Sequence, residues 1–333
     1  MSDPAPSPRV SVGIPTWNRA ELLRECIQSV LDQTMPDFEL HVFDNASTDA
    51  TPEVVASFDD PRITYVRRDQ NLGNQPNMTA ALRAGTAPYV YLLLDDERLL
   101  PTCLQRKAEF LDRHPDVVLV HSVFEEVSVD NEPLSAWASF SELTTDTVET
   151  GPTFIERSFL VPARVHLGSF LARREAVRTE GLFPEDRPLD DHPLFLRIAT
   201  RGSIGFLAEP LDVRRIVPGV SSDAGYLVYE NGRYRPTLWL VKEAKAVLFR
   251  FTEGYATTPA EARRLRRLAR RGARRSATYI LRNRVPGFRP VKQAARDLVE
   301  AVRVEPTILA EPRLLTVLFP RLARIRPAVT PPG

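Results

Sequence analysis

Short apolar runs alternate with amphipathic segments over the first 121 residues. The runs are rich in strand-forming residues and too short for helices, whereas the segments between them place apolar residues on one helical face. Strands are predicted at 10–15, 38–43, 63–66, 89–94 and 117–121, and helices at 19–33, 51–58, 76–84 and 101–113. This alternation predicts a doubly wound α/β sheet with parallel strands and right-handed crossovers.

After His121 the regular alternation weakens. We expect a strand at 123–129 that leaves the parallel core and a loop-like stretch at 130–151. Further short strands are predicted at 166–172, 204–207 and 211–216, and helices at 153–159, 174–178, 194–201, 261–281, 291–302 and 314–325. The pattern therefore predicts a Rossmann-like α/β domain followed by a C-terminal helical appendage.

Three acids, Asp95, Asp96 and Glu97, follow the apolar strand predicted at 89–94. Open α/β sheets bind their ligands at the carboxyl ends of buried parallel strands. Adjacent carboxylates repel one another, so a site that holds them together usually contains a cation, and oxygen ligands suit Mg²⁺ or Mn²⁺. On these residues alone, an acidic helix N-terminus in which Glu97 favours the helix dipole is an equal alternative.

Polar residues also follow the first two predicted strands. Thr16, Trp17 and Asn18 follow the first strand, and Asp44 follows the second. Because the ends of parallel strands lie at one edge of the sheet, these residues should converge with the three acids on one crevice. The first strand lacks a GxGxxG segment and the chain lacks GxxxxGK[ST], which excludes the commonest dinucleotide and P-loop sites.

The composition is ordinary for a globular protein, and 333 residues suffice for a large α/β domain with an appendage. The only cysteines are Cys26 and Cys103, which argues against a disulfide framework and for a reducing compartment. The Pro-rich residues 1–8 lack the apolar core of a secretory signal and are expected to be disordered, and no stretch has the length of a transmembrane helix. We therefore expect a cytoplasmic protein.

The net charge of +1 conceals an asymmetry between the two ends of the chain. Residues 251–333 carry 18 Lys and Arg against 6 Asp and Glu, a net charge of +12, and the first 250 residues carry −11. Eight of the arginines lie in the helix predicted at 261–281. This helix is expected to meet either the acidic domain or an anionic membrane surface. In the second case the protein would be peripheral at the inner face of the membrane. Nucleic acid is not expected as a partner, because aromatic residues do not interleave the arginines.

Seven segments, in this order and spacing, resemble the family 2 glycosyltransferases of the GT-A fold over about residues 9–216. They are VSVGIPTWNR (10–19), FDNASTD (43–49), NLG (71–73), LLLDDERLLP (92–101), GSFLARREAV (168–177), GLFPE (181–185) and LDDHPLFLRIATRG (189–202). The resemblance implies a GT-A domain at 9–220, with a nucleotide-binding half at 9–121 and an acceptor half at 122–220. A basic helical region at 221–333 would follow it.

The resemblance also implies roles in binding a nucleotide-diphosphate sugar. Pro15 and Trp17 would lie against the base, and Asp44 would hydrogen-bond its edge. Asp95 would approach the ribose, and Asp96 would bind the Mg²⁺ or Mn²⁺ that bridges the two phosphates. The other residues expected at the donor are Thr16, Asn18, Asn71 and Gly73.

Asp191, before the helix predicted at 194–201, matches the acid that the family uses as general base, and its neighbour Asp190 is the rival for that role. A hydroxyl acceptor must lose its proton as it attacks, and a divalent cation neutralises the departing diphosphate. One base and a direct displacement invert the configuration at the sugar carbon. His192, next to the base, is a candidate for contact with the acceptor.

This sequence departs from the family pattern in three places. Leu94 and Glu97 flank the Asp pair where many members have a third acid, and Glu97 is expected to support the metal indirectly. Val217 stands where many members carry a His that reaches the metal. An Arg that is often found on the helix after the NLG loop is also missing, so phosphate contacts are expected from another residue.

These observations predict an inverting, metal-assisted glycosyltransferase that acts on a hydroxyl of a glycan, a lipid-linked sugar or a secondary metabolite. A nucleotidyltransferase shares the α/β plan and the metal carboxylates, but it usually has a Gly-rich basic loop after the first strand, which IPTWNR is not. A non-catalytic binding protein with a decayed glycosyltransferase site is the other alternative, and the retention of Asp96 and Asp191 argues against it.

Overall fold

The computed structural model describes residues 7–138, 143–160, 165–177, 191–216, 227–230, 233–236, 238–283, 291–306 and 308. Two compact units result: Met1–Ser158 with Ala163–Val217, and Phe159–Pro162 with Pro218–Gly333. Most of the segment predicted to be disordered, residues 1–6 of 1–8, and the helix predicted at 314–325 lie outside the described residues.

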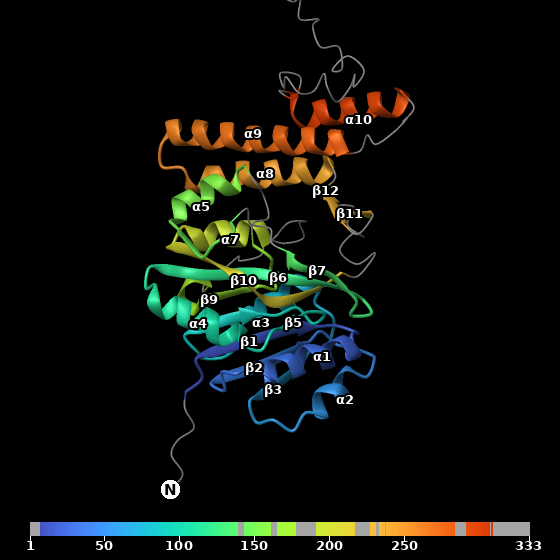
Figure 1. Cartoon of the computed structure of the whole chain (residues 1–333), viewed down its shortest axis with the longest axis vertical. Coiled ribbons are helices and arrows are strands. Elements are labelled where there is room, and N and C mark those ends of the chain that lie inside the picture. The colour runs from blue at the N-terminus through green and yellow to red at the C-terminus, as the bar shows by residue number, and fades with distance from the viewer. Residues whose placement is uncertain are drawn as a thin grey trace, which may run out of the picture. The chain divides into compact units, whose positions relative to one another are not determined.

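The first unit is built on a mixed sheet. Its leading strands are β1 (Val10–Thr16), β2 (Phe38–Asp44), β3 (Ile63–Arg67) and β4 (Tyr89–Leu92), and the helices between them are α1 (Ala20–Leu31), α2 (Thr51–Ala56) and α3 (Asn74–Arg83). The four strands pair in parallel, as predicted, and their order is β3-β2-β1-β4. Strands β1, β2 and β3 are labelled in Figure 1. Their carboxyl ends therefore share one edge of the sheet.

The sheet continues from β4 through β9, β6 and β10 to β5. These elements are β5 (Arg98–Leu99), β6 (Val117–Ser128), β9 (Phe170–Arg173) and β10 (Ser203–Ile216), and α4 (Cys103–Arg113) precedes β6. Strand β9 runs antiparallel to both β4 and β6, so the prediction of an all-parallel sheet is wrong here. Between β6 and β9 the chain forms further strands and a helix, so β6 and β9 are not joined by a single crossover helix. A single crossover helix makes the strands that it joins parallel, and that rule does not apply to this connection.

The region after His121 is more regular than predicted. The strands expected at 117–121 and 123–129 form one strand, β6, and those expected at 204–207 and 211–216 form one strand, β10, whose register shifts around Pro210. The expected loop at 130–151 contains β7 (Pro133–Ala138) and β8 (Thr147–Glu149), which pair with β6 and β10. Pairing partners distant in sequence create these strands, and local pattern does not reveal them.

Three short helices complete this unit: α5 (Gly151–Ser158), α6 (Arg174–Val177) and α7 (Asp191–Ala199). Helix α7 packs against β6 and α5. It begins at Asp191 and not at Leu194, so Asp191 is the first residue of the helix, whereas the sequence predicted a position before the helix.

Strand β1 lies between two layers of helices. Val10, Val12 and Ile14 point to one face and join the core formed with the buried side chains of α1. On the other face Gly13 meets α3, where a Cβ would collide with the backbone carbonyl of Ala81. The absent side chain therefore lets α3 approach β1 closely.

The second unit contains a hairpin of β11 (Leu227–Glu230) and β12 (Arg233–Pro236) and the helices α8 (Leu238–Tyr255), α9 (Pro259–Asn283) and α10 (Val291–Val304). Small and aliphatic side chains form its core: Val241, Ala273, Ala277, Ala301, Val304 and Ile308, with Leu298 and Val302 against them. The hairpin was not predicted. In the described part of the chain, no helix combines the length and the hydropathy needed to cross a bilayer.

Candidate functional site

The turn that contains Asp95, Asp96 and Glu97 connects β4 to β5 at the carboxyl edge of the sheet. Arg19, which immediately precedes α1, reaches across this edge from the end of β1. Its Nη1 donates to Asp95 Oδ1 at 3.0 Å and to Asp96 Oδ2 at 2.9 Å. One guanidinium nitrogen thus bridges the two predicted ligand carboxylates, which agrees with the argument that this pair needs a cation.

The electrostatics of the turn are set by burial and by Arg19. Burial raises the pKa of Asp95 to about 6; Arg19 opposes this shift and the neighbouring Asp96 adds to it. Beneath the turn, Cys26 Sγ donates to the carbonyl of Leu94 at 3.4 Å, and burial together with the nearby acids raises the pKa of this thiol well above its usual value. The site therefore has carboxylates that favour a cation and no thiolate nucleophile at Cys26.

Arg215, near the end of β10, holds the backbone of the acidic turn. Its Nε donates to the carbonyl of Asp96 at 3.1 Å, and its Nη2 donates to Glu25 Oε2 on α1 at 2.6 Å. Its Nη1 donates to the carbonyl of Val129 and to Asn131 Oδ1. One buried guanidinium therefore ties the turn to α1 and to the connection after β6.

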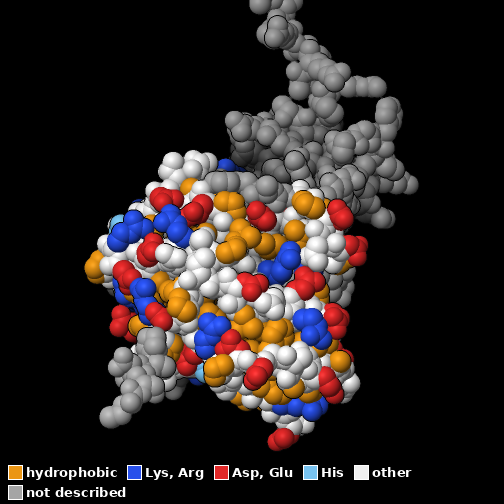
Figure 2. Space-filling view, turned by 60° about the horizontal axis from the view of Figure 1, so that its bottom comes forward, with side chains coloured by type: hydrophobic (Ala, Val, Ile, Leu, Met, Phe, Trp, Pro, Cys, Tyr) orange, Lys and Arg blue, Asp and Glu red, His pale blue; other side chains and the backbone are white. Residues whose placement is uncertain are grey.

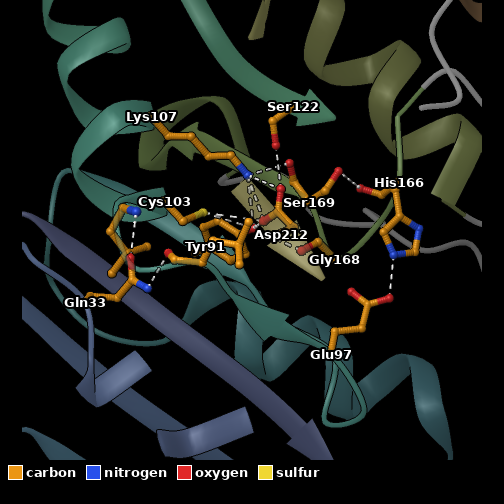
Figure 3. A network of polar contacts seen from close by, with 12 residues as sticks. Gln33, Tyr91, Glu97, Cys103, Lys107, Ser122, His166, Gly168, Ser169 and Asp212 are labelled. Atoms are coloured by element: carbon orange, nitrogen blue, oxygen red, sulfur yellow. Dashed lines mark hydrogen bonds and ion pairs between the residues drawn. The ribbon is translucent and has the colours of Figure 1, made fainter. Parts of the chain in front are cut away.

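Glu97 is held by a residue outside the Asp pair. Its carboxylate pairs with His166 Nε2 at 2.5 Å, and Gly168 lies so close that a Cβ there would collide with Glu97 Oε2 (Figure 3). The backbone of His166 accepts a bond from Ser169 N, so this contact fixes the turn to the segment before β9. Glu97 thus anchors the turn. This role is compatible with the expectation from the sequence that Glu97 supports a metal without binding it directly.

Asp44, predicted to hydrogen-bond the base, is fully buried at the end of β2. Its Oδ1 accepts the backbone N–H of Ser47 at 2.8 Å, and its Oδ2 accepts the hydroxyl of Tyr65 at 2.5 Å. Arg67 Nε lies 3.5 Å from Oδ2. Both carboxylate oxygens are therefore held by the protein, and the contact with a base stays a prediction.

Asn45 brings the loop before α3 to the same edge. Its Oδ1 accepts the N–H of Leu72 at 2.9 Å, and its Nδ2 donates to Asn71 Oδ1 at 2.7 Å and to the carbonyl of Gly73 at 3.0 Å. Gly73 has a φ of 86°, which its lack of a Cβ permits. The predicted donor residues Asn71 and Gly73 therefore lie beside the residue that follows Asp44.

The last residues of β1 and those that follow it differ in what they offer a ligand. Pro15 and Thr16 are buried, whereas Trp17 is 51% exposed. Asn18, with a φ of 53°, binds the 43–49 segment: its N–H donates to Ser47 Oγ, and its Oδ1 accepts the N–H of Thr48. Trp17 thus presents an open aromatic surface at this edge, and Asn18 has a structural role that the sequence did not indicate.

The predicted base, Asp191, opens α7, but its side chain and that of His192 lie outside the described residues, as do Asp190 and Val217. The position of the carboxylate relative to the turn therefore stays a prediction.

Sequence reasoning missed three residues that organise this edge: Arg19, Asn45 and Arg215. Arg19 and Asn45 follow predicted strands at their carboxyl ends, so the rule that identified Trp17 and Asp44 applies equally to them. Arg215 gave no comparable signal, because its bond to Asp96 joins positions 119 residues apart.

The donors at the turn suit a hard divalent cation. Asp95 and Asp96 supply carboxylate oxygens at a position where Arg19 already places a positive charge. Within the described residues, no group of three or more His, Cys, Asp or Glu side chains is arranged as a metal cage. Mg²⁺ is commonly held by one or two carboxylates together with substrate phosphates and water, and the two aspartates fit that arrangement.

The mixed α/β sheet, with paired aspartates after its fourth strand, has the GT-A fold. The solved structure of S. aureus TarS 1-349 in complex with UDP-GlcNAc has the same fold, with a TM-score of 0.61, 14% identity and coverage of 92% of each chain. The mannosyltransferase PcManGT from Pyrobaculum calidifontis, in complex with GDP-Man and Mn²⁺, aligns with a TM-score of 0.56 and 20% identity over 97% of this chain and 84% of that chain.

The sequence comparisons point to one family. Residues 11–166, just under half of the chain, match the model of glycosyl transferase family 2. The succinoglycan biosynthesis protein ExoO of Rhizobium meliloti (strain 1021) is 29% identical over 161 residues. That alignment covers 48% of this chain and 46% of ExoO, so the chain spans about half the length of this curated relative.

Proposed function

We propose that this chain is an inverting glycosyltransferase that moves a sugar from a nucleotide-diphosphate sugar to a hydroxyl acceptor. The observation that carries the proposal is the pair Asp95 and Asp96, bridged by a cationic side chain at the carboxyl edge of β4. The match of residues 11–166 to the model of glycosyl transferase family 2 favours glycosyl transfer over nucleotidyl transfer.

The donor would lie along the edge that β1, β2 and β4 share. Trp17 and Pro15 would contact the base, with Asp44 at its edge and Asp95 near the ribose. The polar backbone and side chains of Thr16, Asn18, Asn71 and Gly73 would complete this part of the site. The exposed ring of Trp17 supports this arrangement, since base–aromatic stacking needs an open ring face.

Asp96, with Asp95 beside it, would hold Mg²⁺ or Mn²⁺. The TarS complex contains UDP-GlcNAc, and the PcManGT complex contains GDP-Man and Mn²⁺. These complexes support a nucleotide-sugar donor and a divalent cation for this chain as well. The cation supplies charge neutralisation for the diphosphate leaving group. Arg215 and Glu97 orient the turn that carries the two aspartates, so their task is to hold the ligand oxygens in place.

Asp191 would remove the proton from the acceptor hydroxyl. Its place at the start of α7, a helix whose following Leu194, Leu196 and Ile198 are buried, puts the backbone of the base on a rigid element. A single carboxylate acting opposite the leaving group inverts the sugar carbon. Relatives named for succinoglycan and colanic acid biosynthesis support a role in polysaccharide assembly.

The release of nucleoside diphosphate from a panel of sugar nucleotides, with and without Mg²⁺ or Mn²⁺, tests the proposal. The parent should release nucleotide in the presence of acceptor and metal. Asp96→Ala should lose most of this activity and most metal-dependent nucleotide binding, whereas the exposed control Asp32→Ala should retain both. Pyrophosphate release from a nucleoside triphosphate and a sugar phosphate would instead identify a nucleotidyltransferase, and binding without turnover would identify a decayed site.

We propose further that α9 meets an anionic lipid surface. Of its nine arginines, Arg263, Arg264, Arg266, Arg267, Arg270, Arg271 and Arg275 are exposed, while Leu265, Ala269, Ala273 and Ala277 are buried. By contrast, the described face in Figure 2 has acidic and basic side chains interspersed. A helix with a basic face and a buried apolar side binds a membrane through charge and does not insert.

Cosedimentation with vesicles tests the role of α9. Vesicles that contain phosphatidylserine should bind the protein at low salt and release it at high salt, and pure phosphatidylcholine vesicles should not bind it. Replacement of Arg263, Arg266, Arg267 and Arg270 by Gln should abolish binding. Retention of lipid binding in that variant, or preferential binding of RNA by the parent, would contradict the proposal.

A further inference from the structure

We propose that Arg19 is an exchangeable cation of this site: it neutralises Asp95 and Asp96 until a divalent cation replaces it there, and it then binds the donor diphosphate. This inference rests on the proposed function, because it needs a nucleotide diphosphate and a metal. It assigns to Arg19 the phosphate contact that the sequence leaves without a residue on α3.

The contacts of Arg19 show that it is positioned by the acids alone. Its side-chain bonds, in the described part of the chain, go from Nη1 to Asp95 Oδ1 and Asp96 Oδ2. Its side chain is 29% exposed, compared with 9% for Asp95 and 15% for Asp96. The guanidinium is therefore the most solvent-accessible member of this group and is held by charge, without other hydrogen bonds that would oppose its movement.

Other arginines near this edge are held differently. Arg215 is engaged by Glu25, Asn131 and two backbone carbonyls, and its side chain is only 2% exposed. Arg67 donates to the carbonyl of Ser47 and pairs with Asp44, and Arg68 donates to Asn77 Oδ1. Movement of any of these would break hydrogen bonds that maintain the edge itself, whereas movement of Arg19 breaks only its two carboxylate contacts.

Charge balance gives the order of events. A divalent cation held by Asp95 and Asp96 would supply more charge to the oxygens that now accept from Arg19, and it would repel the guanidinium. The diphosphate that arrives with the cation offers new acceptors, which guanidinium groups bind through paired hydrogen bonds. The long side chain of Arg19 is anchored at the start of α1, so it can change partner without a change in the backbone.

The two roles predict effects of opposite sign in one variant. Arg19→Gln removes the competing positive charge, so the affinity for Mn²⁺ alone should rise by roughly tenfold. The same variant lacks the phosphate contact, so its affinity for a nucleoside diphosphate at saturating Mn²⁺ should fall roughly 10- to 100-fold. Titration of the protein with Mn²⁺, followed by electron paramagnetic resonance, and calorimetry with UDP and GDP measure the two affinities without any need for turnover.

Two further variants act as controls. Arg24→Gln removes the same charge from the exposed surface of α1, where Arg24 contacts Glu21 and Ser57, and both affinities should stay within about twofold of the parent. Arg19→Lys retains a charge without the planar fork and should recover part of the loss in nucleotide affinity.

The outcomes separate this inference from the function on which it rests. A parent that binds neither Mn²⁺ nor a nucleoside diphosphate would overturn both. If the parent binds both ligands and Arg19→Gln lowers both affinities, or leaves both unchanged, the exchange by Arg19 is wrong and the glycosyltransferase proposal stands. Thermal unfolding of each variant establishes that the compared proteins are folded.

Discussion

Two acid–cation clusters flank β4 and differ in access to solvent. At its carboxyl end, Arg19 bridges Asp95 and Asp96, and all three side chains keep some exposure. Inside the sheet, Lys107 of α4 pairs with Asp212 of β10 at 2.8 Å, with side-chain exposures of 0% and 3% (Figure 3). Both clusters pair a cationic side chain with aspartate, but they differ in burial and in the number of hydrogen bonds.

The inner cluster is saturated with hydrogen bonds. Asp212 accepts from Lys107, from the hydroxyls of Tyr91 and Ser122, and from the thiol of Cys103. Lys107 also donates to the carbonyl of Ser169 at 2.9 Å. No donor or acceptor is left for a ligand, so this cluster stabilises the junction of β4, α4, β6 and β10, whereas the outer cluster can exchange its cation.

The largest effect is expected at the predicted base. Asp191→Asn keeps the size of the side chain but cannot accept a proton, so turnover should fall by about 10²- to 10⁴-fold with donor affinity and thermal stability retained. Turnover and calorimetric donor binding of this variant, with Asp190→Asn as the matched control, provide the measurement. An inactive Asp190→Asn beside an active Asp191→Asn would show that the neighbouring residue is the base, and full activity of both would refute the single-base mechanism.

The next largest effect is expected in the inner cluster. Lys107→Ala leaves Asp212 charged and buried without its partner, which should lower the free energy of unfolding by about 3–5 kcal/mol. Urea denaturation measures this loss, while kcat per folded molecule should change little. The double variant Lys107→Met, Asp212→Leu removes both charges and should recover most of the stability. If Lys107→Ala were as stable as the parent, the inner cluster would not have the stabilising role that distinguishes it from the outer cluster.

The sequence predicted the outer cluster more fully than the inner one. Asp95 and Asp96 follow a strand that is recognisable by itself, so their place at the edge follows from a local pattern and a topological rule. The pair of Lys107 and Asp212 joins positions 105 residues apart, and β9 enters the sheet in a direction that no local pattern encodes. One signal was available, since Lys107 lies on the apolar stripe of its predicted helix, where a charge implies a buried partner.

Within the predicted site, too, local sequence pattern reveals which residues lie at the edge of the sheet but not their contacts with residues distant in sequence. The edge position of Trp17 and Asp44 could be inferred from strand ends, but the enclosure of the Asp44 carboxylate by Tyr65 and Arg67 could not, because it depends on pairing between β2 and β3. For the same reason the anchoring of Glu97 by His166 was not predicted, although Glu97 itself was recognised.

A moderate effect is expected where the turn is anchored. Gly168→Ala places a methyl group against the Glu97 carboxylate and should displace Glu97 from His166, with a loss of about 1–3 kcal/mol in stability and a higher KM for the donor. Gly254→Ala is the control, because nothing lies within 4 Å of a Cβ at that helical position. Denaturation and steady-state kinetics on both variants are the measurements. An unchanged KM in Gly168→Ala would mean that Glu97 does not orient the turn.

The smallest effect concerns Glu39, a carboxylate that is stabilised largely without a cation. Burial alone would raise its pKa, but the Ser11 hydroxyl and the backbone N–H groups of Thr86 and Ala87 outweigh burial and lower the pKa from 4.5 to about 2. The imidazole of His41 lies 3.1 Å from its Oε2. The ionised form of Glu39 is therefore favoured in the folded state, mainly by neutral donors, whereas burial raises the pKa of Asp95 in the outer cluster.

The direction of the shift fixes the pH dependence. A depressed pKa stabilises the folded protein above the unfolded value of 4.5, and this contribution disappears as the pH falls from about 4.5 through about 2. Glu39→Gln should therefore lower the free energy of unfolding by about 1 kcal/mol at pH 7, and the difference from the parent should shrink as the pH decreases through that window. Glu21→Gln, at a largely exposed position of α1, should show no such dependence. Urea denaturation of the three proteins between pH 3 and pH 7 measures the difference, and a gap that stays constant across this range would show that the hydrogen bonds to Glu39 do not favour its ionised form.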